Sequence, residues 1–262
     1  MTSTTWSPTQ YLKFASERSR PFVELLNRVP VENPSLVVDL GCGPASGEEA
    51  LFKVWPQAQL MGVDSSQEMI DRAKLNSTHP RASYLHQDVR RWLQETAPGL
   101  KPDVIVSNAM LQWVEGHLDL LPQIADTLAE GGAFAMQVPG NFTAPSHVLL
   151  REIANRQPYR QYVKESMRDT VIGADRYLEV LSRPGWTVDA WETTYLHILQ
   201  GEDPIFEWNS ATGARPVLNN LPADLKTEFS REYKQALRQA YPAQDFGTVL
   251  PLRRIFAVAV RS

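Results

Sequence analysis

The chain has 262 residues, of which 43% are hydrophobic and 21% are charged, a composition typical of a globular protein with one domain or two small ones. Its 26 basic and 30 acidic side chains give a formal net charge of −4, so charge offers no reason to expect nucleic acid or an anionic membrane as a partner. The chain has a single cysteine, Cys42, which excludes an intramolecular disulfide and a multi-cysteine metal site. The N-terminus does not resemble a signal peptide and no apolar stretch reaches about 20 residues, so we expect the protein in the cytoplasm.

Helical and strand patterns alternate over the first half of the chain. Apolar residues at helical spacing over 11–28, interrupted by Pro21, predict two short helices. Buried strands are predicted at 35–40, 59–63, 82–86, 103–107 and 133–138. Between them, helices are predicted through about Val54, at 67–74, near 90–94 and at 117–130. Ser66 is the expected N-cap of the second of these helices, and Gly131-Gly132 ends the last. This alternation predicts an α/β fold with a mostly parallel, Rossmann-like sheet covered by helices on both faces.

The second half of the chain predicts two closing strands and two helical insertions. Residues 187–199 and 253–261 have strand patterns, which bring the sheet to seven strands. The stretches 141–186 and 201–250 are mainly helical, and no low-complexity linker separates them from the rest. We therefore expect one domain over 1–262 in which 33–140 form the core, while 1–30, 141–186 and 201–250 form a helical cap over a substrate site.

The segment Val37-Val38-Asp39-Leu40-Gly41-Cys42-Gly43-Pro44 has the strongest chemical signal. A hydrophobic strand runs into two glycines and then a helix, and glycine is needed where a backbone must approach a ligand closely. The dinucleotide-binding fingerprint requires a third glycine where this chain has Ser46. Asp39 would repel a pyrophosphate but suits a ligand with an ammonium group, and a plain strand-to-helix turn is the alternative interpretation.

Polar side chains follow the next three predicted strands. Asp64-Ser65 ends the second strand, Asp88-Val89 follows the third, and Asn108 follows the fourth. A carboxylate in the position of Asp64 can accept both hydroxyls of a ribose, and Asp88 could accept from the exocyclic amine of adenine. Each alone could be a solvated turn residue or a helix cap; together they indicate a ligand site at the carboxyl edge of the sheet.

These motifs, with Leu128-Ala-Glu-Gly-Gly-Ala-Phe, resemble those of the class I S-adenosylmethionine-dependent methyltransferases over about residues 33–140. The resemblance implies S-adenosyl-L-methionine as cofactor and assigns its methionine part to Asp39, Gly41, Cys42 and Gly43. It also assigns the ribose to Asp64 with Ser65, the adenine to Asp88 with Val89, and places Met69 against the adenosine and Asn108 beside the cofactor. After Pro44 the run Ala45-Ser46-Gly47-Glu48 departs from the usual Gly-Asn-Ser-Thr-like form.

A narrower resemblance extends over almost the whole chain, to carboxyl methyltransferases that esterify small polycarboxylates. It is carried by Trp6–Pro21, Ser107–Trp113, Pro145–Glu152 and Trp208–Pro216. An acceptor carboxylate is already ionised at neutral pH, so we expect positional catalysis with no catalytic residue and no metal. The residues expected to bind the substrate are cations and aromatic walls: Tyr11, Arg18, Arg20, Trp113, His147, Arg151, Tyr195 and Arg215.

Three other functions remain open at this point. One is a methyltransferase for another carboxylic acceptor, such as a malonyl group on a carrier protein. A second is an NAD-dependent oxidoreductase, against which the missing third glycine and Asp39 both count. The third is a binding protein that holds the cofactor without transferring its methyl group.

Overall fold

The structure is a computed structural model that describes residues 15–163 and 172–262, and within the first helix it describes side chains from Ser19 onward. The chain forms two compact units. The sheet unit consists of Arg18–Pro139, Ile172–Thr193 and Arg254–Ser262. Among the described residues, the helical unit consists of 15–17, 140–163 and 194–253.

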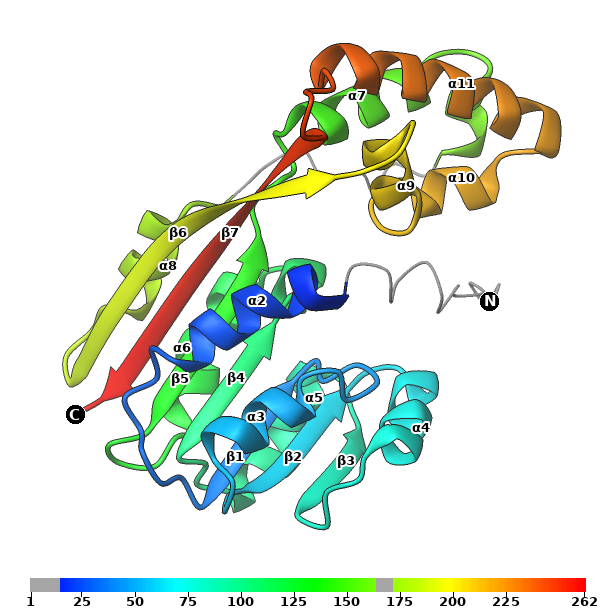
Figure 1. Cartoon of the computed structure of the whole chain (residues 1–262). Helices are drawn as coiled ribbons and strands as arrows, with labels where there is room; N and C mark the ends of the chain where they lie inside the picture. The colour runs from blue at the N-terminus through cyan, green and yellow to red at the C-terminus, as the bar shows by residue number, and fades with distance from the viewer. Residues whose placement is uncertain (1–14, 164–171) are drawn as a thin grey trace. The chain divides into compact units, whose positions relative to one another are not determined.

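The sheet has seven strands in the order β3-β2-β1-β4-β5-β7-β6 (Figure 1). Neighbouring strands from β3 to β5 are parallel, and β7 runs antiparallel to β5, with Ala133 opposite Val260. The strands are β1 (Leu36–Leu40), β2 (Gln59–Asp64), β3 (Ala82–His86), β4 (Val104–Asn108), β5 (Ala133–Pro139), β6 (Trp186–Leu199) and β7 (Thr248–Arg261). The predicted Rossmann-like, mostly parallel sheet is confirmed.

Helices connect the strands of the sheet unit. They are α2 (Ala15–Leu26), α3 (Glu48–Val54), α4 (Gln67–Asn76), α5 (Val89–Arg91), α6 (His117–Asp126) and α8 (Ala174–Leu181), with a 3-10 turn η3 at Leu111–Trp113. Because parallel crossovers are right-handed, α3 and α4 cover one face and α6 the other. Ser66 caps α4 as predicted, since its Oγ accepts from the backbone N–H of Met69 at 3.4 Å.

Two helix predictions were wrong in detail. One helix, α2, continues through Pro21 instead of breaking there, and Phe22, Leu25 and Leu26 after the proline are buried. Burial of these side chains offsets the loss of one backbone hydrogen bond at Pro21. The helix after β4 ends at Asp126 rather than at 130.

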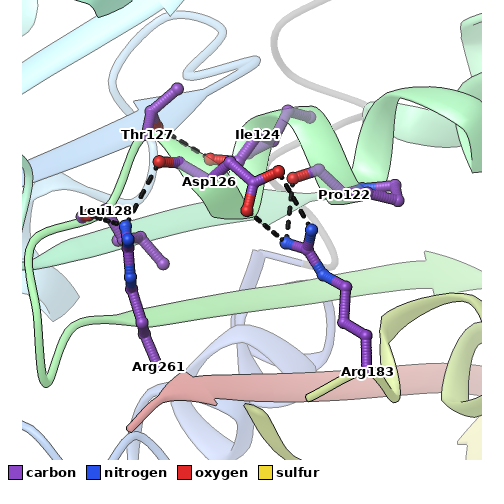
Figure 2. A network of polar contacts seen from close by, with 7 residues as sticks. All are labelled: Pro122, Ile124, Asp126, Thr127, Leu128, Arg183 and Arg261. Atoms are coloured by element: carbon purple, nitrogen blue, oxygen red, sulfur yellow. Dashed lines mark hydrogen bonds and ion pairs between the residues drawn. The ribbon is translucent and has the colours of Figure 1, made fainter. Parts of the chain in front are cut away.

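Two arginines from late in the chain bind the carboxyl end of α6 (Figure 2). Arg183 contacts both oxygens of the Asp126 carboxylate, at 2.7 and 2.9 Å, and also the carbonyl of Pro122. Arg261 donates to the carbonyls of Asp126 and Leu128 at 3.3 and 2.7 Å. Cations are favourable at this end of a helix, because its last carbonyls have no partner within the helix.

The helical unit has its own core. It contains α7 (Pro145–Ala154), α9 (Pro204–Ser210), α10 (Arg215–Asn220) and α11 (Ala223–Ala240), seen in Figure 1. Side chains buried in it include Leu150, Tyr159, Trp208, Phe229 and Tyr233. Residues 172–186, predicted to belong to the cap, lie in the sheet unit instead, where Tyr177 of α8 contacts His117 of α6. No helix in the described part of the chain is long and apolar enough to cross a membrane.

Candidate functional site

The turn after β1 is held against the end of β2. The carbonyl of Val63 accepts from the backbone N–H groups of Gly41 and Cys42 at 2.8 and 3.1 Å. Gly41 and Gly43 have φ of 83° and 55°, values that favour glycine. A Cβ on Gly41 would lie 2.3 Å from Cβ and Cγ of Met110, so the turn also requires glycine for space.

Asp64, at the end of β2, joins this turn to the next helix. Its Oδ2 accepts from the backbone N–H of Gly43 at 3.0 Å and its Oδ1 accepts from that of Ser66 at 2.8 Å. Each carboxylate oxygen has two lone pairs, so both can still accept from a ligand. The arrangement is suited to a pair of hydroxyl donors.

Asp39 is buried beside the turn, with 6% of its surface exposed. Burial, together with the nearby negative charge of Asp64, raises the pKa of Asp39 to about 7. Burial also raises the pKa of the Cys42 thiol, and the charges of Asp39 and Asp64 act in the same direction. Two acids in this position favour a cationic ligand over a phosphate.

Asp88 follows β3 and begins α5. Its Oδ1 accepts from the backbone N–H groups of Arg90 and Arg91 at 2.9 and 3.2 Å, so this residue is a helix cap as well as a candidate ligand residue. Its side chain is exposed and Val89 beside it is buried. The capping contacts fix the direction of the carboxylate.

A cleft of about 340 Å³ lies at this edge of the sheet. Its volume suits a small organic ligand. Of the predicted cofactor residues, those that line it are Gly41, Asp64, Ser65, Asp88 and Val89. The others do not line it: Cys42 and Gly43 belong to the turn, Asp39 lies within β1, Asn108 ends β4, and Met69 is half-buried in the first turn of α4.

Several residues of this cleft were not predicted from the sequence. Met110, Val114 and Glu115 line it, as do Gln87 and Arg90. Met110, Val114 and Glu115 could have been predicted from their position in the segment after β4, because open α/β sheets bind ligands at the carboxyl edge. Trp113 also lines this cleft and is 71% exposed, although we expected it at the substrate site.

The predicted substrate residues are divided between the units. Tyr11 and the side chain of Arg18 lie outside the described residues. Arg20, in the sheet unit, forms an exposed ion pair with Glu24 at 2.9 Å. The helical unit contains the remaining four, namely His147, Arg151, Tyr195 and Arg215.

Two segments of the helical unit meet at His147, in the first turn of α7. Its Nδ1 lies 3.3 Å from Oγ of Ser146, and its ring lies edge-on to Phe142. A Cβ built on Gly213, two residues before Arg215, would lie 3.2 Å from Nε2 of His147. Two of the segments that carry the narrower resemblance are therefore neighbours.

The other two predicted substrate residues of this unit have structural contacts. Arg151 donates to the carbonyl of Phe142 at 2.6 Å, which fixes one of its guanidinium nitrogens. Tyr195 is buried, with 3% of its surface exposed, and stacks against His197. Tyr195 therefore forms part of the packing of this unit, whatever its role toward a ligand.

A buried polar network supports the start of α7. Asn209 donates to Oη of Tyr233 at 3.0 Å, and Tyr233 donates to the carbonyl of Ser146 at 2.8 Å. The N–H of Ser146 donates to Oη of Tyr241 at 3.0 Å. These contacts join α9, α11 and α7 beside His147. Among the described residues, no group of three or more His, Cys, Asp or Glu side chains could hold a metal ion.

Comparison with known proteins shows which family this chain resembles. A family model described as "Methyltransferase domain" matches residues 37–132. The trans-aconitate 2-methyltransferase of Streptomyces avermitilis is 46% identical, over 97% of this chain and 96% of the relative. The enzyme of the same name from Escherichia coli O157:H7 is 42% identical, over 98% of both chains.

Solved structures share the fold. The plantazolicin methyltransferase BpumL in complex with SAH has a TM-score of 0.51 and 16% identity, over 97% of this chain and 86% of that chain. The YcgJ protein from Bacillus subtilis has a TM-score of 0.56 and 15% identity, over 92% and 98%. At these identities the likeness shows the fold alone.

Proposed function

Because this chain belongs to the trans-aconitate 2-methyltransferase family, we propose that it transfers a methyl group from S-adenosylmethionine to a carboxylate of trans-aconitate. The observation that carries the proposal is identity above 40% over nearly the full length of curated relatives with this name. The same alignment covers both units, so it includes the residues of the helical unit as well as the cofactor motifs.

The residues of the cleft fit this cofactor. Bound S-adenosylmethionine supplies a methyl group on a cationic sulfur, and its transfer to a carboxylate oxygen yields a methyl ester and S-adenosylhomocysteine. Asp64 presents two oriented oxygens for the ribose hydroxyls, and Asp88 presents a carboxylate for the adenine amine. Asp39 provides the negative charge that an ammonium group requires.

The acceptor needs no general base, because its carboxylates are ionised at neutral pH. The protein's task is then to orient the acceptor and to exclude water. Arg151, Arg215 and His147 of the helical unit are proposed to bind the carboxylates that do not react. A cation on the reacting carboxylate would stabilise the charge that disappears in the transition state and would slow the reaction.

The test is incubation with methyl-labelled S-adenosylmethionine and a panel of acids. We expect base-labile labelled ester on trans-aconitate and little on simple dicarboxylates. Labelling of a malonyl group on a carrier protein, without labelling of trans-aconitate, would instead establish the alternative carboxylic acceptor. Calorimetric binding of S-adenosylhomocysteine with no ester on any acid would contradict the proposed activity while leaving the cofactor site intact.

Substitution of the helical-unit cations tests the substrate site. Arg215→Ala is expected to raise the KM for trans-aconitate about tenfold or more, since it removes a charge-assisted hydrogen bond. The KM for S-adenosylmethionine should not change. Arg156→Ala is the matched control, because Arg156 is an exposed arginine just after α7 that was not assigned to the site.

A further inference from the structure

One wall of the cofactor cleft is a loop between two residues with left-handed backbone. Met110, Trp113, Val114 and Glu115 line the cleft. The loop is preceded by Ala109, with φ of 56°, and followed by Gly116, with φ of 62°. An alanine in this conformation is costly, and such residues persist only where surrounding contacts impose them. Contacts with neighbouring elements must therefore hold this wall.

Two side chains from outside the loop bind its backbone near the cleft. The guanidinium of Arg90, from α5, donates to the carbonyl of Glu115. The imidazole of His117, the first residue of α6, lies with Nδ1 3.3 Å from the carbonyl of Val114. Val114 and Glu115 are adjacent, so both contacts act on the same part of the wall.

His117 is itself fixed by a third element. Its Nε2 lies 2.9 Å from Oη of Tyr177 in α8, and the two rings are 5.8 Å apart at 27°. Both side chains are buried, with 6% and 1% of their surfaces exposed. A carbonyl can only accept, so Nδ1 of His117 carries the hydrogen, and in the neutral imidazole Nε2 then accepts from the Tyr177 hydroxyl.

We propose that His117 is a positioning residue for the cofactor: it holds the wall of the cleft at Val114, and Tyr177 holds its ring in the required orientation. The proposal rests on the proposed function, because it assumes that the cleft binds the cofactor. His117 does not line the cleft, so its effect passes through the loop. His117 thereby connects α8, which was predicted to belong to the cap, to the wall of the cleft. All three segments belong to the sheet unit.

Two amide substitutions separate the two contacts of the ring. In His117→Asn the amide nitrogen lies near the former Nδ1 and can still donate to Val114. In His117→Gln the amide lies near the former Nε2, where its oxygen can accept from Tyr177, but its nitrogen cannot reach Val114. We expect the Kd for S-adenosylhomocysteine, measured by calorimetry, to rise about three- to tenfold in His117→Gln and to stay near the wild-type value in His117→Asn.

Leu181→Ala is the control for a general loss of stability. Leu181 is fully buried in α8, on the same helix as Tyr177, and does not line the cleft. If His117→Gln binds the cofactor as tightly as the wild type, or if His117→Asn and Leu181→Ala weaken binding as much as His117→Gln does, the proposal is wrong.

Hydrogen exchange in the unliganded protein provides a second readout that does not depend on the cofactor. Amides of residues 110–116 should exchange faster in His117→Gln than in His117→Asn or Leu181→Ala. If the wild type fails to bind S-adenosylhomocysteine, the proposed function fails, and this exchange pattern still decides whether His117 holds the wall. Equal exchange in all three variants would overturn the inference.

Discussion

The carboxylate of Asp64 is bound by the backbone N–H of Gly43 at 3.0 Å, which links the end of β2 to the glycine turn after β1. The same carboxylate accepts from Ser66 at the start of α4. The side chain of Asp64 therefore connects three segments at the edge of the cleft: the glycine turn, the end of β2 and the start of α4. A carboxylate held by two backbone donors is oriented before any ligand arrives, so little conformational entropy is lost when hydroxyl groups bind it.

We predict that Asp64→Asn weakens the binding of S-adenosylhomocysteine at least tenfold. The amide has one acceptor oxygen instead of two, and its NH₂ group must face one of the two backbone donors. Loss of a hydrogen bond to a charged group costs about 1.5–3 kcal/mol. Calorimetry measures the effect, with Asp71→Asn as control, because Asp71 is an exposed acid on α4 that accepts from Gln67 and does not line the cleft. An unchanged Kd for Asp64→Asn would remove Asp64 from the ribose site.

The two glycines of the turn should respond differently to alanine. In Gly41→Ala the new Cβ would lie 2.3 Å from Met110, in addition to the strain of φ at 83°, whereas a Cβ on Gly43 meets nothing within 4 Å. We expect Gly43→Ala to cost about 1–2 kcal/mol of backbone strain and Gly41→Ala to cost more, because Met110 must move as well. Denaturant unfolding of both variants measures the difference. Equal losses of stability would mean that Met110 moves aside freely.

The sequence predicted the sheet unit well because its signals are local. Each strand from β1 to β5 is a short apolar run bounded by turn residues, and the acids that follow β2 and β3 reach the cleft. Ser66 capped its helix as predicted, since capping depends on residues within one turn.

The predictions were wrong where contacts between residues far apart in the sequence determine the structure. Nothing near Ala174–Leu181 in the sequence shows that this helix packs on α6, since the contact joins Tyr177 to His117 across 60 residues. Pro21 was expected to end a helix, but burial of Phe22, Leu25 and Leu26 maintains it. The role of Trp113 at the substrate stays a prediction, and only the path of the chain after β4 shows that Trp113 lines the cleft beside Asp64 and Asp88.

The single cysteine should react slowly with thiol reagents in the native protein. Cys42 is buried, and burial raises the pKa of its thiol, so little reactive thiolate is present at neutral pH. We expect labelling by a chromogenic disulfide reagent to be slow in buffer and fast in denaturant. S-Adenosylhomocysteine should slow the native reaction further, because Gly41 next to Cys42 lines the cleft. A thiol that reacts at the same rate in buffer and in denaturant would contradict its burial.

The burial of Asp39 opposes stability, whereas its charge is proposed to serve ligand binding. Its pKa is raised to about 7 in the folded protein, against an ordinary value of 3.8. Between these two pH values the folded protein retains a proton that the unfolded chain has released. The free energy of unfolding therefore falls as pH rises through this window, by an amount of the order of a few kcal/mol, and does not fall further from this cause above it.

Asp39→Asn removes this titration. The variant should equal the wild type in stability near pH 4 and exceed it at pH 8, yet bind S-adenosylhomocysteine more weakly, because an amide cannot pair with an ammonium group. In the wild type near pH 7, binding of the cation favours the ionised carboxylate and should release a proton, which calorimetry in buffers of different ionisation enthalpy detects. Asp39→Asn should show no such release. Proton release that persists in Asp39→Asn, or a variant no more stable than the wild type at pH 8, would show that Asp39 is already ionised in the unliganded protein.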